Sequence, residues 1–161
     1  MTIKIGDKLP NAAFRLVTPD GPKPVTTQEF FGGRKIVLFG LPGAFTPTCH
    51  KNHLPGFLAE EAAFKAKGVD AIAMTSVNDH HVLAAWAKAT GAEGHIDFLA
   101  DGSADFAKAA GLSYDASPSG MGVRSRRYSA LVVDGVVKQL NIEETTGKAD
   151  LSGAAHILAQ I

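Results

Sequence analysis

The chain has 161 residues, of which 45% are hydrophobic and 20% are charged, a composition that excludes a disordered, collagenous or fibrous protein. The formal net charge is zero, which argues against binding to nucleic acid through bulk charge. The single cysteine, Cys49, excludes an internal disulfide and a metal site built from several thiolates. The length predicts a single domain spanning residues 1–161.

Neither a membrane span nor a signal peptide is visible in the sequence. No apolar run approaches the roughly 18 residues that a membrane helix needs. Residues 1–7 contain no apolar stretch before a small-residue cleavage site, although a mature chain that has lost a targeting segment would look the same. Because there is no cysteine pair to oxidise, the reducing cytoplasm is the expected compartment.

The first third of the chain predicts a short helix, a buried strand and a longer helix. After an apolar run at 14–17 and a Pro-Asp-Gly-Pro turn, Thr26 offers an N-cap for a short helix. Residues 34–41 form a continuous apolar run, typical of a strand buried on both faces. A Pro/Gly loop leads into a helical stretch to about residue 68, in which Pro55 either kinks the helix or lies in its first turn.

Strands and helices continue to alternate after this helix. Residues 69–77 and 96–100 are predicted strands, and the helix between them can be capped by Asn78 or Asp79 and ends at Gly91. A short helix at residues 103–110 follows.

The C-terminal part predicts a hairpin and a last helix. Asp134-Gly135 joins two β-rich segments, 128–133 and 136–142, and a helix is expected at 151–161. The early alternation implies parallel pairing, whereas the hairpin implies antiparallel pairing. We therefore predict a three-layer α/β fold with a mixed central β-sheet and helices on both faces.

Cys49 is the residue whose surroundings carry most chemical information. It follows a buried strand and a Pro/Gly loop, in the first turn of a helix for which Thr48 is a candidate N-cap. The free N–H groups and the positive dipole end at this place favour the thiolate, the nucleophilic form of cysteine. Thr46, three residues earlier, can bring its hydroxyl to the side of the thiol. The alternatives are an inert buried cysteine and a turn or capping threonine.

The sequence around Cys49 resembles a known family. Pro-Gly-Ala-Phe-Thr-Pro-Thr-Cys at 42–49, followed by His-Leu-Pro-Gly-Phe at 53–57, is similar to the active-site signature of the type II, or peroxiredoxin-five-like, peroxiredoxins. The resemblance extends to Ser-Val-Asn-Asp at 76–79 and Arg-Tyr-Ser at 127–129. It implies a thioredoxin-like fold and a thiol-dependent peroxidase that reduces hydrogen peroxide and alkyl hydroperoxides. It implies no metal, flavin or haem cofactor.

The resemblance also implies roles for individual residues. Cys49 would be the peroxidatic cysteine, which attacks the peroxide as a thiolate and becomes a sulfenic acid. Thr46 would hydrogen-bond the thiolate and the peroxide, and Pro42 would shield the thiolate from water. Arg127 would hold the thiolate anionic and stabilise the leaving oxygen. Arg126 lies on the opposite face of an extended strand and is the alternative if the register slips. A solvated basic patch or an anion site is the other interpretation of this Arg-rich loop.

The solitary cysteine implies an external reductant. Some relatives carry a resolving cysteine in the C-terminal stretch, near the position of Leu151 in this chain. By resemblance to single-cysteine relatives, glutathione with glutaredoxin is favoured, while a thioredoxin-type protein and an intermolecular disulfide stay open. The family also implies a homodimer packed through the active-site loops, and an exposed Phe45 would agree with such an interface.

Two positions depart from the family pattern. His50 stands where a serine commonly follows the cysteine, and His80-His81 stand where a small residue or proline and then phenylalanine are common. One alternative is a metal site of Cys49, His50 and His53 with His80 and His81 as further ligands. Another is a cysteine hydrolase that uses His50 or His53 as its base. A third alternative is a redox sensor or chaperone-like module that consumes peroxide no faster than a free thiol.

Overall fold

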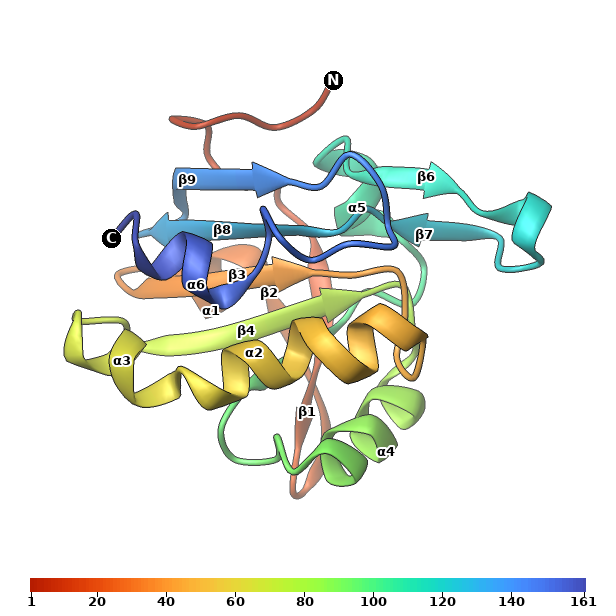
Figure 1. Ribbon diagram of the computed structural model, residues 1–161, viewed down its shortest axis with the longest axis horizontal. Coiled ribbons are helices and arrows are strands. Elements are labelled where there is room, and N and C mark those ends of the chain that lie inside the picture. Colours follow the sequence, from red (N-terminus) through yellow and green to blue (C-terminus); the bar gives the residue numbers. More distant parts are fainter.

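The computed structural model describes residues 1–161, which form a seven-stranded mixed sheet with helices against both faces (Figure 1). The strand order is β2-β1-β5-β4-β3-β8-β9, and β6 and β7 form a separate two-stranded sheet. The strands are β1 (Ala13–Thr18), β2 (Gly21–Thr26), β3 (Lys35–Gly40), β4 (Ala71–Ser76), β5 (Asp97–Ala100), β6 (Ser113–Asp115), β7 (Val123–Ser125), β8 (Tyr128–Val133) and β9 (Val136–Ile142). The helices are α1 (Thr27–Phe31), the π-helix η1 (Cys49–His53), α2 (Leu54–Ala59), α3 (Glu61–Ala66), α4 (His80–Thr90), α5 (Asp105–Ala109), the 3₁₀-helix η2 (Ser117–Ser119) and α6 (Ala154–Leu158).

The pairing of β3 explains where the chain after it must go. β3 pairs in parallel with β4 and antiparallel with β8, so the predicted mixed sheet is confirmed. Residues 36–40 of β3 are all buried, as the continuous apolar run predicted. In the antiparallel register, Gly40 at the end of β3 pairs with Tyr128 at the start of β8. Arg127 therefore lies next to the loop that leaves β3 toward Cys49.

Two hydrophobic clusters pack against the two faces of the sheet. One contains side chains of α2, α3, α4 and α6 together with Cys49, and the other contains side chains of α1 and α5. Figure 1 shows α2, α3, α4 and α6 on the near side of the sheet. The predicted three-layer arrangement is thus confirmed. None of the helices is long and apolar enough to cross a membrane.

The helix boundaries follow the expected capping signals in two places. Thr26 caps α1 in a capping box with Glu29. Asp79, rather than Asn78, caps α4, and Gly91 ends it in the left-handed conformation with φ 72°. The last helix is shorter than predicted, and the helical stretch before residue 68 is divided at Glu60 into α2 and α3.

Thr48 is not the N-cap that the sequence predicted. Helical backbone begins at Pro47, and Thr48 has helical φ and ψ without a side-chain capping bond. A proline suits this start because the first turn of a helix has no use for its missing N–H. The Thr48 hydroxyl instead donates to the Gly147 carbonyl at 3.2 Å, a partner 99 residues away that local sequence does not indicate.

Pro55 accounts for the π-helix that carries Cys49. Proline lacks an N–H and crowds the carbonyl four residues before it, here that of Lys51. The wider turn of η1 precedes it, and the Leu54 N–H bonds to the Cys49 carbonyl five residues back. Of the two predicted outcomes, Pro55 takes the second: it lies in the first turn of α2, directly after the π-turn that begins at Cys49.

Two glycine substitutions test how tightly this framework is packed. A methyl group at Gly40 would overlap the Tyr128 ring, whereas one at Gly56 in α2 would meet nothing within 4 Å. Gly40→Ala is expected to lower the free energy of unfolding by about 1–3 kcal/mol through overpacking. Gly56→Ala is expected to raise it by about 0.5–1 kcal/mol through helix propensity. Urea denaturation of both variants measures the difference, and a Gly40→Ala protein as stable as the wild type would contradict the packing described.

Candidate active site

Cys49 lies at the start of η1 with its side chain fully buried. Its Sγ accepts a hydrogen bond of 3.0 Å from Arg127 Nη2. The register of β3 and β8 thus joins two residues that are 78 positions apart in the sequence. A cationic donor at this distance stabilises an anionic sulfur in a place where water is excluded.

The Arg127 guanidinium is held in place by neutral partners. Nη1 donates to His53 Nδ1 at 2.9 Å, and Nε and Nη2 donate to the Thr146 carbonyl at 3.1 and 3.0 Å. No carboxylate forms an ion pair with this buried side chain, so its positive charge remains for the sulfur. Arg126, the alternative considered from the sequence, instead donates from Nη2 to the Glu143 carbonyl at 3.4 Å.

His53 supports Arg127 from the next turn of the helix. Because its Nδ1 accepts from a guanidinium, which can only donate, its proton is on Nε2, which donates to the Ser152 carbonyl at 2.9 Å. Burial, and then the charge of Arg127, lower the pKa of His53 from 6.5 to about 3. The imidazole is therefore neutral, and it positions Arg127 without cancelling its charge.

The lowered pKa of His53 predicts a loss of stability in acid. The unfolded chain takes up a proton near pH 6.5, whereas the folded chain resists it down to about pH 3. The contribution of His53 is therefore complete above pH 6.5 and falls with pH below it, with a slope approaching about 1.4 kcal/mol per pH unit.

Replacement by glutamine isolates this contribution. The His53→Gln side chain keeps an acceptor for Arg127 and a donor for Ser152, and it does not titrate. Urea denaturation between pH 7 and 5 is expected to show a shallower pH dependence in this variant than in the wild type. Parallel curves for the two proteins would show that His53 is protonated equally in the folded and unfolded states.

The loop between β9 and α6 closes the site from the C-terminal side. Glu143 is buried, and its carboxylate accepts from Ser152 N at 2.6 Å and Ser152 Oγ at 2.7 Å. This bond fixes the two ends of residues 144–151, which carry the Thr146 carbonyl to Arg127 and the Gly147 carbonyl to Thr48. Figure 1 shows this loop turning back from the end of β9 to reach α6.

The loop before Cys49 is braced by one residue of β7 and one of the turn between β4 and α4. Pro42 is buried, and its carbonyl accepts from Arg124 Nη1 at 3.3 Å. The Ala44 N–H donates to Asn78 Oδ1 at 3.0 Å, which assigns to Asn78 a bracing role instead of the helix cap. The loop is therefore a fixed wall beside the thiol.

Thr46 does not hydrogen-bond the sulfur, in contrast to the interaction that the family resemblance implied. Its hydroxyl donates to the Gly43 carbonyl at 2.8 Å, while its own carbonyl accepts from the His50 N–H. The donor of this hydroxyl is thus used by a carbonyl three residues earlier in the same loop. The hydroxyl oxygen keeps its lone pairs, and these can accept from the O–H of a peroxide.

Removing the Thr46 hydroxyl is expected to slow the reaction with peroxide. Thr46→Val keeps the shape of the side chain but cannot accept a hydrogen bond, so the second-order rate constant should fall by about 10- to 100-fold. Thr46→Ser keeps the hydroxyl and should remain within a few-fold of the wild type. Rapid-mixing measurements of peroxide consumption compare them, and an unchanged Thr46→Val protein would exclude a contact between this hydroxyl and the substrate.

Comparison with known proteins connects this arrangement to a family. The redoxin family model matches residues 4–158. Peroxiredoxin-2E-2, chloroplastic, of Oryza sativa is 50% identical over 158 residues, which cover 92% of this chain and 70% of the relative. Peroxiredoxin-2C of the same species is 45% identical, with 97% and 96% covered. The crystal structure of reduced Prx3 of Vibrio vulnificus in complex with H₂O₂ has a TM-score of 0.93 at 45% identity, with 99% of each chain covered.

The chain belongs to the peroxiredoxins. It is a type II peroxiredoxin with one cysteine, a thioredoxin-like fold and thiol peroxidase activity, as the resemblance implied. It acts on peroxides and depends on thiol reductants.

The geometry of this peroxiredoxin argues against the two alternatives raised by its histidines. Both ring nitrogens of His53 are occupied, and His50 Nδ1 accepts from Trp86 Nε1 at 2.9 Å, so neither is placed as a base for Cys49. His50 and His53 face different partners, and the structure contains no group of three or more side chains able to hold a metal. His80 and His81 lie in the first turn of α4, with ring centroids 4.1 Å apart.

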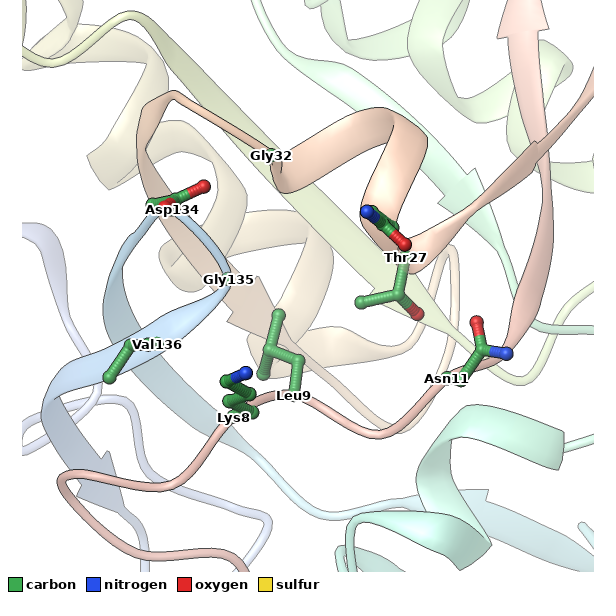
Figure 2. Close-up of a pocket in the computed structure, with 9 residues that line it drawn as sticks. Lys8, Leu9, Asn11, Thr27, Gly32, Asp134, Gly135 and Val136 are labelled. Atoms are coloured by element: carbon green, nitrogen blue, oxygen red, sulfur yellow. The ribbon is translucent and has the colours of Figure 1, made fainter.

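A cavity of about 420 Å³ lies away from the thiol of this peroxiredoxin (Figure 2). It is bounded by Lys8 and Leu9 of the N-terminal segment, by α1, and by the β8–β9 turn at Asp134. This turn bonds to the chain that precedes β3, whereas Cys49 comes after the other end of that strand. The cavity therefore lies at the opposite end of the strands from Cys49.

Three supporting groups were not predicted from the sequence. The positioning role of His53, the Thr146 carbonyl and the Glu143–Ser152 pair all depend on how residues 143–152 fold back on the site. A backbone carbonyl leaves no mark in the sequence. Glu143, directly after the last predicted strand, was the one weak signal for this loop. A carboxylate buried there would require hydrogen-bond donors nearby.

Proposed function

We propose that the Cys49 thiolate attacks the terminal oxygen of a hydroperoxide. A sulfur–oxygen bond forms as the oxygen–oxygen bond breaks, which leaves a sulfenic acid on Cys49 and releases an alkoxide or hydroxide that takes up a proton. The substrates are hydrogen peroxide and alkyl hydroperoxides. The 3.0 Å hydrogen bond from the unneutralised guanidinium of Arg127 to Cys49 Sγ carries this proposal.

The neighbouring residues act on the same step. Arg127 shares its positive charge between the sulfur and the oxygen that becomes negative in the transition state. The hydroxyl oxygen of Thr46 accepts a hydrogen bond from the peroxide O–H and thereby orients the oxygen–oxygen bond toward the sulfur. Pro42 is buried in the braced loop and keeps water from the thiolate.

The second half of the cycle needs an external thiol, because Cys49 is the sole cysteine. A thiolate attacks the sulfenic sulfur, forming a disulfide and releasing the oxygen as water, and a second thiol then releases the reduced Cys49. The loop that carries Leu151 offers no resolving cysteine. Resemblance to single-cysteine relatives favours glutathione with glutaredoxin as the reductant, with a thioredoxin-type protein as the alternative.

A turnover assay distinguishes the reductants. Peroxide consumption is measured with glutathione, glutaredoxin and glutathione reductase, and separately with thioredoxin and thioredoxin reductase. The proposal predicts sustained turnover with the glutathione system and the appearance of a Cys49–glutathione disulfide. Turnover only with thioredoxin would overturn the choice of reductant.

The proposed assembly is a homodimer of chains that each act as one domain over residues 1–161. Phe45 supports a contact through the active-site loop, because this side chain is 51% exposed and its backbone has a φ of 64°. Light scattering at micromolar concentration is expected to give twice the mass of one chain. The proposed compartment is the cytoplasm, whereas the rice relative peroxiredoxin-2E-2 is named as a chloroplast protein.

A further inference from the structure

Burial of Cys49 raises a problem for the reductive step of the proposed cycle. The side chain is fully buried, yet the sulfur of an external thiol must reach bonding distance of Sγ. A thiol on glutathione or a protein brings with it groups far larger than a peroxide. The turn that carries Cys49 must therefore swing outward before a disulfide with a thiol of this size can form.

The residue after Cys49 ties this turn to a neighbouring helix. His50 Nδ1 accepts a hydrogen bond of 2.9 Å from Trp86 Nε1, and the partly exposed Phe45 ring stacks on His50 with centroids 5.6 Å apart. Trp86 belongs to α4, is fully buried, and packs edge-on against Phe98 of β5. The indole is thus held by the core, and His50 is the part of the pair that can move.

The surroundings of the pair favour one opening motion. The η1 turn includes the bond from Leu54 N to the Cys49 carbonyl, and π-turns within helices are frequent at functional sites. Since His50 follows Cys49 directly, swinging Sγ outward carries the imidazole away from Trp86. The indole N–H would then remain buried without its acceptor, which opposes the motion.

We propose that the hydrogen bond between His50 and Trp86 is a latch that controls access of thiol reductants to Cys49. Only the role of the latch in the catalytic cycle rests on the proposed function. The accessibility of Sγ itself can be measured without peroxide. His50 and Trp86 act as positioning residues: they touch neither the peroxide nor the reacting sulfur. A peroxide needs only a small displacement beside Sγ, whereas a thiol reductant requires the turn to swing outward.

The test compares a bulky and a small thiol reagent on the reduced protein. The reagents are 5,5′-dithiobis(2-nitrobenzoate) and methyl methanethiolsulfonate, and the ratio of their rates cancels changes in the thiolate population. His50→Phe keeps an aromatic ring under Phe45 but removes the acceptor, and Trp86→Phe removes the donor. Each variant is expected to raise the ratio of the rate with the bulky reagent to the rate with the small one by about 2- to 10-fold. This is the effect expected from losing one hydrogen bond.

Two controls separate a latch from general loosening. Lys51→Ala alters an exposed side chain on the same turn with no hydrogen bond or ion pair, and its ratio should equal that of the wild type. The double variant His50→Phe/Trp86→Phe should be no faster than the single ones, because both remove the same bond. An unchanged ratio in His50→Phe would overturn the proposal, as would equal acceleration of both reagents or additive effects in the double variant.

The sole tryptophan of the chain gives an independent readout. Attaching glutathione to Cys49 must hold the turn open and remove the acceptor of Trp86, so the wild-type emission should change. The same modification of His50→Phe should change it less. Identical spectra before and after glutathionylation of the wild type would contradict the latch. If Cys49 fails to react rapidly with peroxide while the reagent ratios behave as expected, only the proposed function is lost.

Discussion

Replacing Cys49 with serine is expected to abolish peroxide consumption completely. Cys49 is the sole thiol of the chain, and a serine hydroxyl at the same place is neither ionised at neutral pH nor able to reduce a peroxide. Loss of hydrogen peroxide, followed in the presence of glutathione and glutaredoxin, should fall to the rate of the solution without the enzyme.

Lys51→Ala serves as the matched control for this loss, because Lys51 is exposed on the same turn and should leave the rate unchanged. A Cys49→Ser protein that still consumed peroxide would place the chemistry elsewhere in the chain. A wild-type protein that consumed peroxide no faster than free glutathione would favour the redox sensor or chaperone-like module instead.

Replacing Arg127 with alanine is expected to lower the rate constant for peroxide reduction by about 10²- to 10³-fold. The variant loses the donor to Cys49 Sγ and the charge that meets the leaving oxygen, and removal of one such preorganised donor typically has an effect of this size. Arg127→Lys restores a charge but not the planar fork that also bonds His53 and Thr146, so it should recover only part of the rate.

The adjacent Arg126 provides the control for charge alone. It carries the same charge but donates to the Glu143 carbonyl instead of to Cys49, and Arg126→Ala should stay within a few-fold of the wild type. Thermal unfolding of all three variants shows whether the fold survives. Equal losses in Arg126→Ala and Arg127→Ala would mean that the general basicity of the loop, rather than the geometry at Cys49, drives the reaction.

The main features of the fold could be predicted because they depend on local patterns. The apolar run of β3, the Asp134-Gly135 turn and the cap at Asp79 each carry their own physical signal. Arg127 was chosen from the family pattern of arginine, aromatic residue and serine, and the alternation of an extended chain only ranked Arg126 second; in the structure Arg127 donates to Cys49 Sγ and Arg126 to the Glu143 carbonyl. Cys49, after β3, and Arg127, before β8, were therefore expected in one site.

The rest depends on contacts that are distant in the sequence. β2 escaped prediction because it contains Pro22 and Pro24, which are tolerated only because this strand lies at the edge of the sheet. The partners of Thr46 and Thr48 are backbone carbonyls, which any residue supplies. His50 departed from the family pattern, but only the fold shows that Trp86 is its partner.

The site also explains why a chain of zero net charge can favour a buried anion. The guanidinium of Arg127 is oriented by His53 and Thr146, and its charge is opposed by no carboxylate. The neutral state of His53 is essential here, because a protonated imidazole could not accept from Arg127. The net charge of the sequence does not reveal this local arrangement.

Mass spectrometry of Cys49 after one equivalent of hydrogen peroxide tests the central claim most directly. The account predicts one oxygen atom added to Cys49 in nearly every chain, trapped by a sulfenic-acid-selective reagent, and its replacement by a glutathione disulfide when glutathione follows. A Cys49 that remains a free thiol while the peroxide persists, or while methionines are oxidised instead, would contradict the account.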